Sequence, residues 1–120
     1  MNCLFCKIIN KEIPSSIVYE DNNIIVFLDI KPQTNGHMLI IPKKHYLDIS
    51  DIDEHILNHI NKISKKMNQL LIDKLKIDGL TIVQNNGCAQ EVKHYHLHLI
   101  PKYNNQIPLT LEQVYQLLTT

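Results

Sequence analysis

The sequence predicts an α+β domain built on an antiparallel sheet that carries its helices on one face. Three short apolar runs come first, one long amphipathic stretch follows, and two more apolar runs come after it. This order of elements is typical of a sheet that pairs neighbouring strands and packs helices against one side. The chain of 120 residues suits one domain with its own core, and 44% hydrophobic with 20% charged residues is ordinary for a globular protein.

The predicted strands are short apolar runs bounded by turn-forming residues. Four polar residues at 20–23 join the first two runs, as in a hairpin. Pro42 ends the third run, because proline cannot continue a strand interior. The five runs are residues 17–19, 24–28, 36–41, 80–84 and 94–101.

The predicted helices differ in length. Residues 3–10 are long enough for one or two turns, and residues 110–118 begin with a capping-box pattern. Ser50 is predicted to begin the one long helix, since acidic residues follow it in the first turn. On this helix His55 and His59 are interpreted as part of a solvated face. Its core-facing stripe repeats at steps of three and four: Ile52, Ile56, Ile60, Ile63, Met67, Leu70 and Leu71.

Charge and composition narrow the class of protein. Twelve acidic residues balance twelve basic ones, which argues against a general nucleic-acid binder. Every basic residue is lysine, so no guanidinium fork is available to clamp a phosphate. No segment has the apolar length to cross a bilayer, and the start does not resemble a signal peptide. Three cysteines, an odd number, fit a reducing cytoplasm better than a disulfide framework.

The most informative segment is residues 94–101, which read His-Tyr-His-Leu-His-Leu-Ile-Pro. A period of two is the strand period, so the three histidines are expected on one face of a strand and the apolar residues on the other. Two interpretations of this row stay open. In one, the central His96 is a nucleophile that attacks phosphorus. In the other, alternate histidines bind a catalytic metal with Glu91 as the nearest additional ligand.

The pair Cys3-x-x-Cys6 is the second motif with chemical meaning. A redox pair normally follows a strand and opens a helix within a βαβ unit, whereas this pair opens the chain. Half a zinc site needs two more ligands, and His45 and His94 are available. The spacing therefore favours a Cys2His2 zinc site over a redox pair. A third cysteine, Cys88, lies in a short loop and is interpreted as a small loop residue.

These residues resemble the histidine triad (HIT) family of nucleotide-binding hydrolases and transferases. Residues 94–100 match the family motif His-φ-His-φ-His-φ-φ, in which φ is hydrophobic. Residues 5–14, 18–21 and 27–30 are similar to the amino-terminal half of the family, and residues 36–45 are similar to its central strand. The resemblance is greatest to the Hint-like bacterial branch.

The resemblance implies a HIT-like fold with about five antiparallel strands, one long and one short helix, and a sheet continued across a homodimer. It implies a HIT domain at residues 3–108 and a C-terminal tail at 109–120 that contains a short helix. The implied activity is hydrolysis of AMP or GMP phosphoramidates through a covalent nucleotidyl-histidine intermediate, with a purine nucleotide as substrate. Dinucleoside polyphosphate hydrolysis, or a nucleotide-binding scaffold dimer with incidental activity, are the alternatives.

The resemblance also implies a role for individual residues. His96 matches the nucleophile, and His98 and His37 match the histidines that flank the phosphate. The predicted zinc ligands are Cys3, Cys6, His45 and His94. The predicted nucleotide contacts are Asp29, Leu4, Phe5, Ile8, Phe27, Ile30, Asn85, Gln90 and Val92. Glu91 departs from the family pattern, because many members carry Ser or Thr there.

Overall fold

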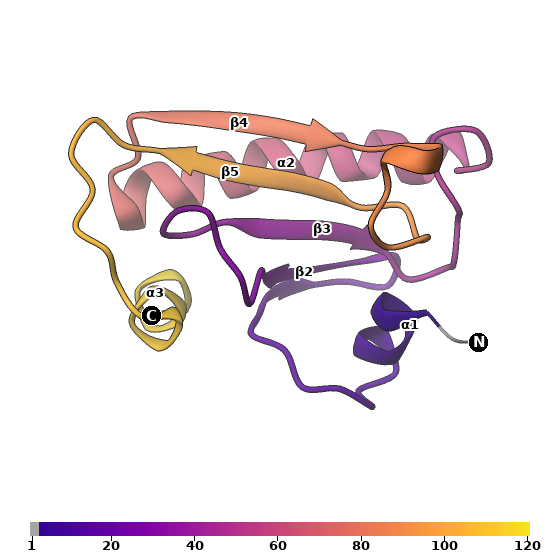
Figure 1. The fold of residues 1–120 in the computed structure, drawn as a ribbon, viewed down its shortest axis with the longest axis horizontal. Helices are drawn as coiled ribbons and strands as arrows, with labels where there is room; N and C mark the ends of the chain where they lie inside the picture. The colour runs from indigo at the N-terminus through magenta and orange to yellow at the C-terminus, as the bar shows by residue number, and fades with distance from the viewer. Residues whose placement is uncertain (1–2) are drawn as a thin grey trace.

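The computed structural model describes residues 3–120 and confirms an α+β fold with a five-stranded antiparallel sheet (Figure 1). The strand order is β1-β2-β3-β5-β4, so the last strand in sequence lies inside the sheet. The strands are β1 (Ile17–Glu20), β2 (Ile24–Leu28), β3 (Met38–Pro42), β4 (Gly79–Gln84) and β5 (Leu97–Lys102). The helices are α1 (Leu4–Ile9), α2 (Glu54–Leu75), α3 (Leu111–Thr119) and the 3-10 turn η1 (Gly87–Ala89).

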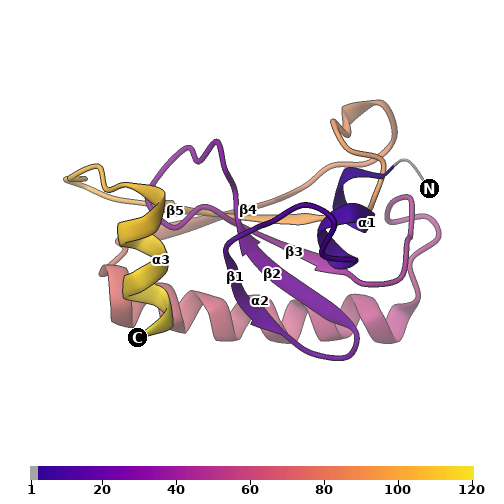
Figure 2. The ribbon, with the colours of Figure 1, turned by 90° about the horizontal axis from the view of Figure 1, so that it is seen from below.

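Helices cover both faces of the sheet, so the expectation of helices on one face is wrong. Figure 2 shows α2 along one side of the sheet and α1 on the other. The physical reason is that β2 and β3 are apolar at every position and buried on both faces. Ile24, Val26 and Leu28 pack into the core on the α2 side. Ile25 and Phe27 pack with Phe5 of α1 on the other side.

The long helix α2 begins at Glu54, and the prediction that Ser50 begins it is wrong. Its N-cap is Asp53, whose carboxylate accepts from the backbone N–H groups of His55 and Ile56. The acidic residues before it stabilise a separate turn: Asp51 accepts from the backbone of residues 47 and 48, and Asp48 accepts from that of residue 50. Asp48 and Asp51 therefore stabilise the turn before the helix, and Asp53 is the carboxylate that caps the helix itself.

The histidine strand is shorter than predicted, because β5 begins at Leu97 and only His98 of the three histidines lies on it. Residues 94–96 precede the region where β3 and β4 flank β5, and the backbone N–H of Tyr95 donates to the carbonyl of Tyr46 instead. The alternation of faces nevertheless holds. Tyr95, Leu97 and Leu99 pack in the core on the α2 side, and the histidines lie on the α1 side.

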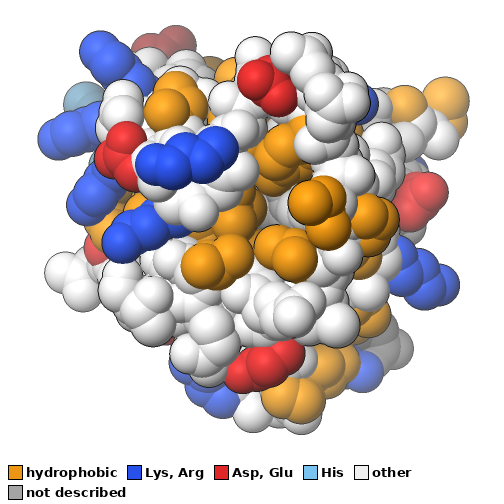
Figure 3. All heavy atoms as spheres, turned by 90° about the vertical axis from the view of Figure 1, so that its left-hand side faces the viewer, with side chains coloured by type: hydrophobic (Ala, Val, Ile, Leu, Met, Phe, Trp, Pro, Cys, Tyr) orange, Lys and Arg blue, Asp and Glu red, His pale blue; other side chains and the backbone are white. Residues whose placement is uncertain are grey.

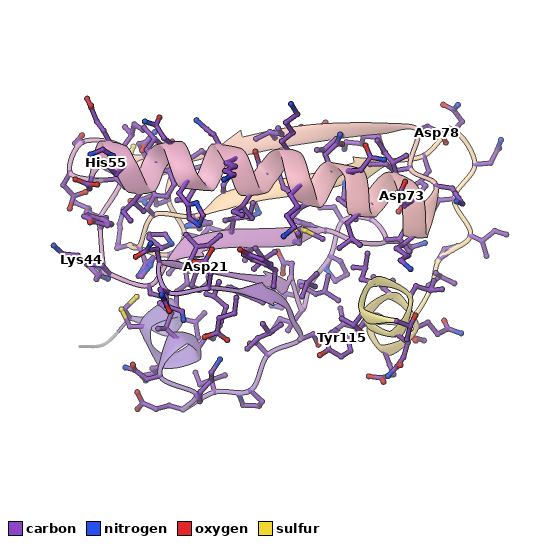
Figure 4. The ribbon with its side chains drawn as sticks, turned by 180° about the vertical axis from the view of Figure 1, so that it is seen from behind. Asp21, Lys44, His55, Asp73, Asp78 and Tyr115 are labelled. Carbon is purple, nitrogen blue, oxygen red and sulfur yellow. The ribbon has the colours of Figure 1, made fainter. Side chains whose placement is uncertain are left out.

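The α2 side of the sheet also carries α3 and one partly buried ion pair. Val114 of α3 belongs to the same core as α2. Asp21, labelled with His55 in Figure 4, lies in the β1–β2 turn, and its Oδ2 is 2.6 Å from His59 Nε2 of α2. His59 is therefore partly buried and paired, contrary to the interpretation as a solvated face. Among the described residues, no helix is long and apolar enough to cross a membrane.

Candidate active site and metal centre

A cavity of about 670 Å³ lies between α1, the loop after β2 and the segment before β5. Eleven of the twelve residues predicted to act in catalysis or nucleotide binding line it, although they come from six separate parts of the chain. These residues are Leu4, Phe5, Ile8, Phe27, Asp29, Ile30, His37, Asn85, Val92, His96 and His98.

One end of the cavity has an apolar wall. Phe5 and Phe27 meet edge to face with ring centroids 5.6 Å apart. Leu4 is 47% exposed and Ile30 is 75% exposed, so apolar surface remains open to a ligand at this end. A flat heterocycle buries such surface favourably, and the Asp29 carboxylate beside it is a hydrogen-bond acceptor.

His96 lines the cavity, and one nitrogen of its ring takes part in a hydrogen bond. Its Nδ1 lies 2.7 Å from the carbonyl oxygen of His94. A carbonyl only accepts, so Nδ1 carries the proton and Nε2 keeps its lone pair. The His96 ring packs edge-on against Phe5 with centroids 5.0 Å apart, which fixes its orientation. The result is an imidazole held in one orientation, with Nε2 as the nitrogen that is not bonded to the His94 carbonyl.

His37 and His98 form a directional hydrogen-bonded pair beside it. The backbone N–H of Gln33 donates to Nδ1 of His37 at 3.1 Å, so His37 carries its proton on Nε2. That Nε2 is 3.0 Å from Nδ1 of His98 and 3.5 Å from Oδ2 of Asp29. His98 Nδ1 therefore accepts, and its proton lies on Nε2.

Burial sets the charge of both rings. Desolvation lowers the pKa of His98 to about 4, with His96 and His37 adding to the effect and Asp29 opposing it. Desolvation also lowers the pKa of His37, again against Asp29. Both rings are neutral near pH 7, so His98 offers an N–H donor to an oxygen or nitrogen in the cavity.

The predicted zinc ligands converge at the other end of the histidine run. Nδ1 of His94 is 3.4 Å from the sulfur of Cys3, 3.6 Å from that of Cys6 and 3.1 Å from Nδ1 of His45. The sulfur of Cys6 is 3.3 Å from Nδ1 of His45. Tetrahedral zinc with ordinary Zn–S and Zn–N bonds separates sulfur from nitrogen by about 3.5 Å and two nitrogens by about 3.3 Å. The donor set and its spacing fit a zinc ion.

Surrounding groups support the same assignment. Nε2 of His94 lies 2.9 Å from the carbonyl oxygen of Pro42, so its proton is there and Nδ1 faces the two sulfurs with a lone pair. Burial and the neighbouring Cys3 thiol raise the pKa of Cys6 to about 11, and a bound cation acts in the opposite direction. His94 is completely buried, so its ring is shielded from solvent.

Gln90 is the one predicted contact that does not line the cavity. Its Nε2 donates to the carbonyl of Leu47 at 2.7 Å, and its Oε1 is buried without a hydrogen-bond partner among the described residues. The sequence reasoning also missed lining residues at Ile13 and Pro14, although both lie within the stretch that matches the family. No sequence signal identifies the backbone N–H of Gln33, which fixes the proton position on His37.

Comparisons with known proteins identify the family of this chain. The HIT domain family model matches residues 10–105. An uncharacterized HIT-like protein of Methanocaldococcus jannaschii is 47% identical over 104 residues, covering 84% of this chain and 79% of that protein. The adenosine 5'-monophosphoramidase HNT1 of Saccharomyces cerevisiae is 45% identical over 102 residues, covering 83% of this chain and 62% of that protein.

Solved structures show the same fold. The crystal structure of a zinc-bound histidine triad family protein from Mycobacterium smegmatis matches with a TM-score of 0.91 and 33% identity, covering 99% of this chain and 91% of that one. The family model spans most of the sequence, and the fold and histidine motif agree with it. This protein is a member of the HIT domain family.

Proposed function

We propose that this protein hydrolyses conjugates of nucleoside 5′-monophosphates, of the AMP or GMP phosphoramidate type, through a nucleotidyl-His96 intermediate. The observation that carries the proposal is the bond from His96 Nδ1 to the His94 carbonyl, which leaves Nε2 as the free nucleophile in the cavity. The HNT1 relative, an adenosine 5'-monophosphoramidase, supports the substrate class.

The first step transfers the nucleotidyl group to His96. Nε2 attacks phosphorus, the new N–P bond forms, and the bond from phosphorus to the leaving nitrogen breaks. The electron pair of that bond leaves with the nitrogen, which takes up a proton from the solvent and departs as an amine. The Nε2–H of neutral His98 is available to hold the oxygen on which negative charge develops.

The second step releases the product. Water attacks phosphorus and releases a proton to the solvent, the new P–O bond forms, the N–P bond breaks, and its electron pair returns to Nε2 of His96. A nucleoside 5′-monophosphate leaves the cavity. The apolar wall with Phe5 and Phe27 holds the base in this proposal, and Asp29 accepts from the ribose hydroxyls.

We also propose that Cys3, Cys6, His45 and His94 hold a structural zinc ion. The ion would fasten α1 to the segment before β5, and thereby fix the His94 carbonyl that orients His96. The zinc-bound relative from Mycobacterium smegmatis supports this assignment. Zinc in this role supplies rigidity, and the chemistry at phosphorus belongs to the histidines.

A homodimer and a cytoplasmic location complete the proposal. The strand β4 lies at one edge of the sheet and pairs only with β5 among the described residues, and Ile82 on it is 54% exposed. Exposed edge strands readily pair with another copy. Light scattering measures this directly, with twice the chain mass as the expected result.

The decisive experiment is hydrolysis of adenosine 5′-phosphoramidate by the wild-type protein, His96→Ala and His55→Ala. We expect His96→Ala to lose hydrolysis by at least about 10⁴-fold while retaining AMP binding, because nucleophile removal affects only the chemical steps. His55 is an exposed histidine at the start of α2, so His55→Ala is the matched control.

Intact-protein mass spectrometry tests the intermediate. A brief reaction quenched in alkali is expected to show one added nucleotidyl group on the wild type and none on His96→Ala. Turnover of His96→Ala at the wild-type rate contradicts the mechanism. AMP binding by the wild type without turnover of any conjugate supports the scaffold alternative instead.

A further inference from the structure

Glu91 places an unpaired carboxylate in the cavity wall. It lines the cavity together with His96 and His98, and it is exposed to solvent. Within residues 3–120 the Glu91 carboxylate takes part in no ion pair or side-chain hydrogen bond. A carboxylate without a protein partner remains available to a ligand.

Glu91 lines the cavity from the segment that follows β4, and Val83 of β4 also lines it. In the sheet order β1-β2-β3-β5-β4, β4 lies beside β5, where Val83 pairs with His98, and is separated by β5 and β3 from β2, which carries Phe27. The proposed base site includes Phe27 of β2. A nucleotide with its base at Phe27 and its phosphorus at His96 runs from β2 toward the β4 side of the cavity, and Glu91 lines the cavity from the segment after β4.

The cavity provides little positive charge for an anionic leaving group. The chain contains no arginine, and of its twelve lysines only Lys31 lines the cavity, beside Asp29 and Ile30 at the nucleoside end. Lys93 is close to Glu91 in sequence, but its Nζ donates to the carbonyl of Gly87 at 2.6 Å. A polyphosphate normally requires several cationic donors.

We infer that Glu91 selects the leaving group by charge. The favoured substrates are nucleoside phosphoramidates whose departing amine carries a second, positively charged group, and polyanionic leaving groups such as a nucleoside polyphosphate are disfavoured. This inference rests on the proposed hydrolase function and specifies its substrate class. A carboxylate about 4 Å from an ammonium in a partly solvated site changes kcat/KM by about five- to tenfold for one unit of charge.

The test uses three AMP phosphoramidates with leaving amines of equal length. The leaving groups are 1,4-diaminobutane, which keeps one free ammonium, n-pentylamine, which is neutral, and 4-aminobutanoate, which carries a carboxylate. We expect the wild-type kcat/KM to fall in that order, by about fivefold or more at each step. Glu91→Gln is expected to bring the three values within about twofold, and Glu91→Lys to reverse the order.

The quantity compared is the ratio of kcat/KM values between substrates for one variant. A general loss of activity lowers all three values alike and leaves this ratio unchanged. Glu54→Gln, which removes the same charge on α2 across the sheet, is the control and is expected to keep the wild-type ratios. Wild-type ratios should also contract in 1 M NaCl, where the screening length is about 3 Å. This arm needs no variant.

The outcomes separate the two proposals. If the wild type turns over all three substrates but Glu91→Gln or high salt leaves the ratios unchanged, selection by Glu91 is overturned and the hydrolase stands. If the wild type turns over none and forms no nucleotidyl adduct, the proposed function itself fails.

Discussion

Two clusters of ligand-type side chains stand at opposite ends of the histidine run, and they differ in chemistry. Both the set Cys3, Cys6, His45 and His94 and the set Asp29, His37 and His98 bring one ligand atom from each member within 4.8 Å of the others. The first set contains two sulfurs, is closed to solvent at His94 and has a tetrahedral spacing. The second opens on the cavity.

The difference shows that proximity alone does not make a metal site. In the open set of Asp29, His37 and His98, both ring nitrogens of His37 and Nδ1 of His98 already take part in hydrogen bonds, from Gln33 to His37 and from His37 to His98. In the closed set the lone pair of His94 Nδ1 faces two sulfurs and another ring nitrogen, a crowding of donors that a cation stabilises. In the proposed assignment, the same residue type is structural at one end and reactive at the other because of these partners.

The largest predicted effect comes from breaking the closed set. Cys6→Ser is expected to reduce bound zinc from one ion per chain to almost none, because serine is a poor zinc ligand. If free zinc is about 1,000-fold above its Kd for the wild type, the loss costs about 4 kcal/mol of folding free energy. Metal analysis and thermal unfolding measure both quantities.

Matched variants separate this effect from a general one. Cys88→Ser makes the same substitution at an exposed cysteine outside the cluster and is expected to keep the zinc. His37→Asn breaks the open set and is also expected to keep it. Full zinc content in Cys6→Ser, with an unchanged melting temperature, contradicts the assignment.

From the sequence, the residues that come together were easier to predict than the bounds of the strands and helices that carry them. Alternation correctly placed the three histidines on one face and Tyr95 on the other, because period two persists in extended chain outside a hydrogen-bonded strand. The start of β5 was not predictable, since it depends on where β3 and β4 flank it. The start of α2 was not predictable either, because several acidic residues could cap it and the structure shows that Asp53 does so, while Asp51 accepts from the preceding turn.

The distinction between the two ends of the site depends on contacts that no local pattern encodes. The proton positions of His96 and His37 are set by the His94 carbonyl and the backbone N–H of Gln33. Almost every residue has the same main-chain N–H and carbonyl groups, so the sequence does not indicate which of them contacts a given side chain. These partners are seen only in the structure. The domain boundary predicted at residue 108 stays a prediction, and α3 beyond it packs into the main core through Val114.

An intermediate effect is expected from titrating the open set. Because the pKa of His98 is about 4 in the folded chain and about 6.5 when unfolded, the unfolded state binds more protons between these values. Folding stability from this residue is therefore complete above about pH 6.5 and is lost as the pH falls toward 4. Between pH 7 and pH 5 the loss is about 1–2 kcal/mol.

Urea unfolding of His98→Gln measures this contribution. Between pH 7 and pH 5, the unfolding free energy of the variant is expected to fall by about 1–2 kcal/mol less than that of the wild type. The exposed His55 provides the control, since His55→Gln should keep the wild-type dependence. An identical pH dependence in His98→Gln would show that burial does not keep this ring neutral.

The smallest predicted effect tests how the open set is held from a distance. The loop that carries Asp29 and Gln33 is tied to residues 103–109 through Asn35. Its side chain donates to the carbonyl of Ile107 at 2.8 Å and accepts from the backbone of Leu109 at 3.0 Å. Figure 3 shows this end of the molecule, where hydrophobic side chains gather and Ile107 is 80% exposed.

Asn35→Ala removes both side-chain bonds and should cost about 1 kcal/mol of stability, because each exposed bond contributes little on its own. A looser loop holds Asp29 less firmly, so we expect KM for an AMP conjugate to rise about threefold while kcat and zinc content stay within error. Asn104→Ala, on the same segment but without a side-chain hydrogen bond among the described residues, is the control. A lower zinc content in Asn35→Ala would mean that the two clusters are coupled through the loop, and the separation of a closed structural end from an open reactive end would not hold.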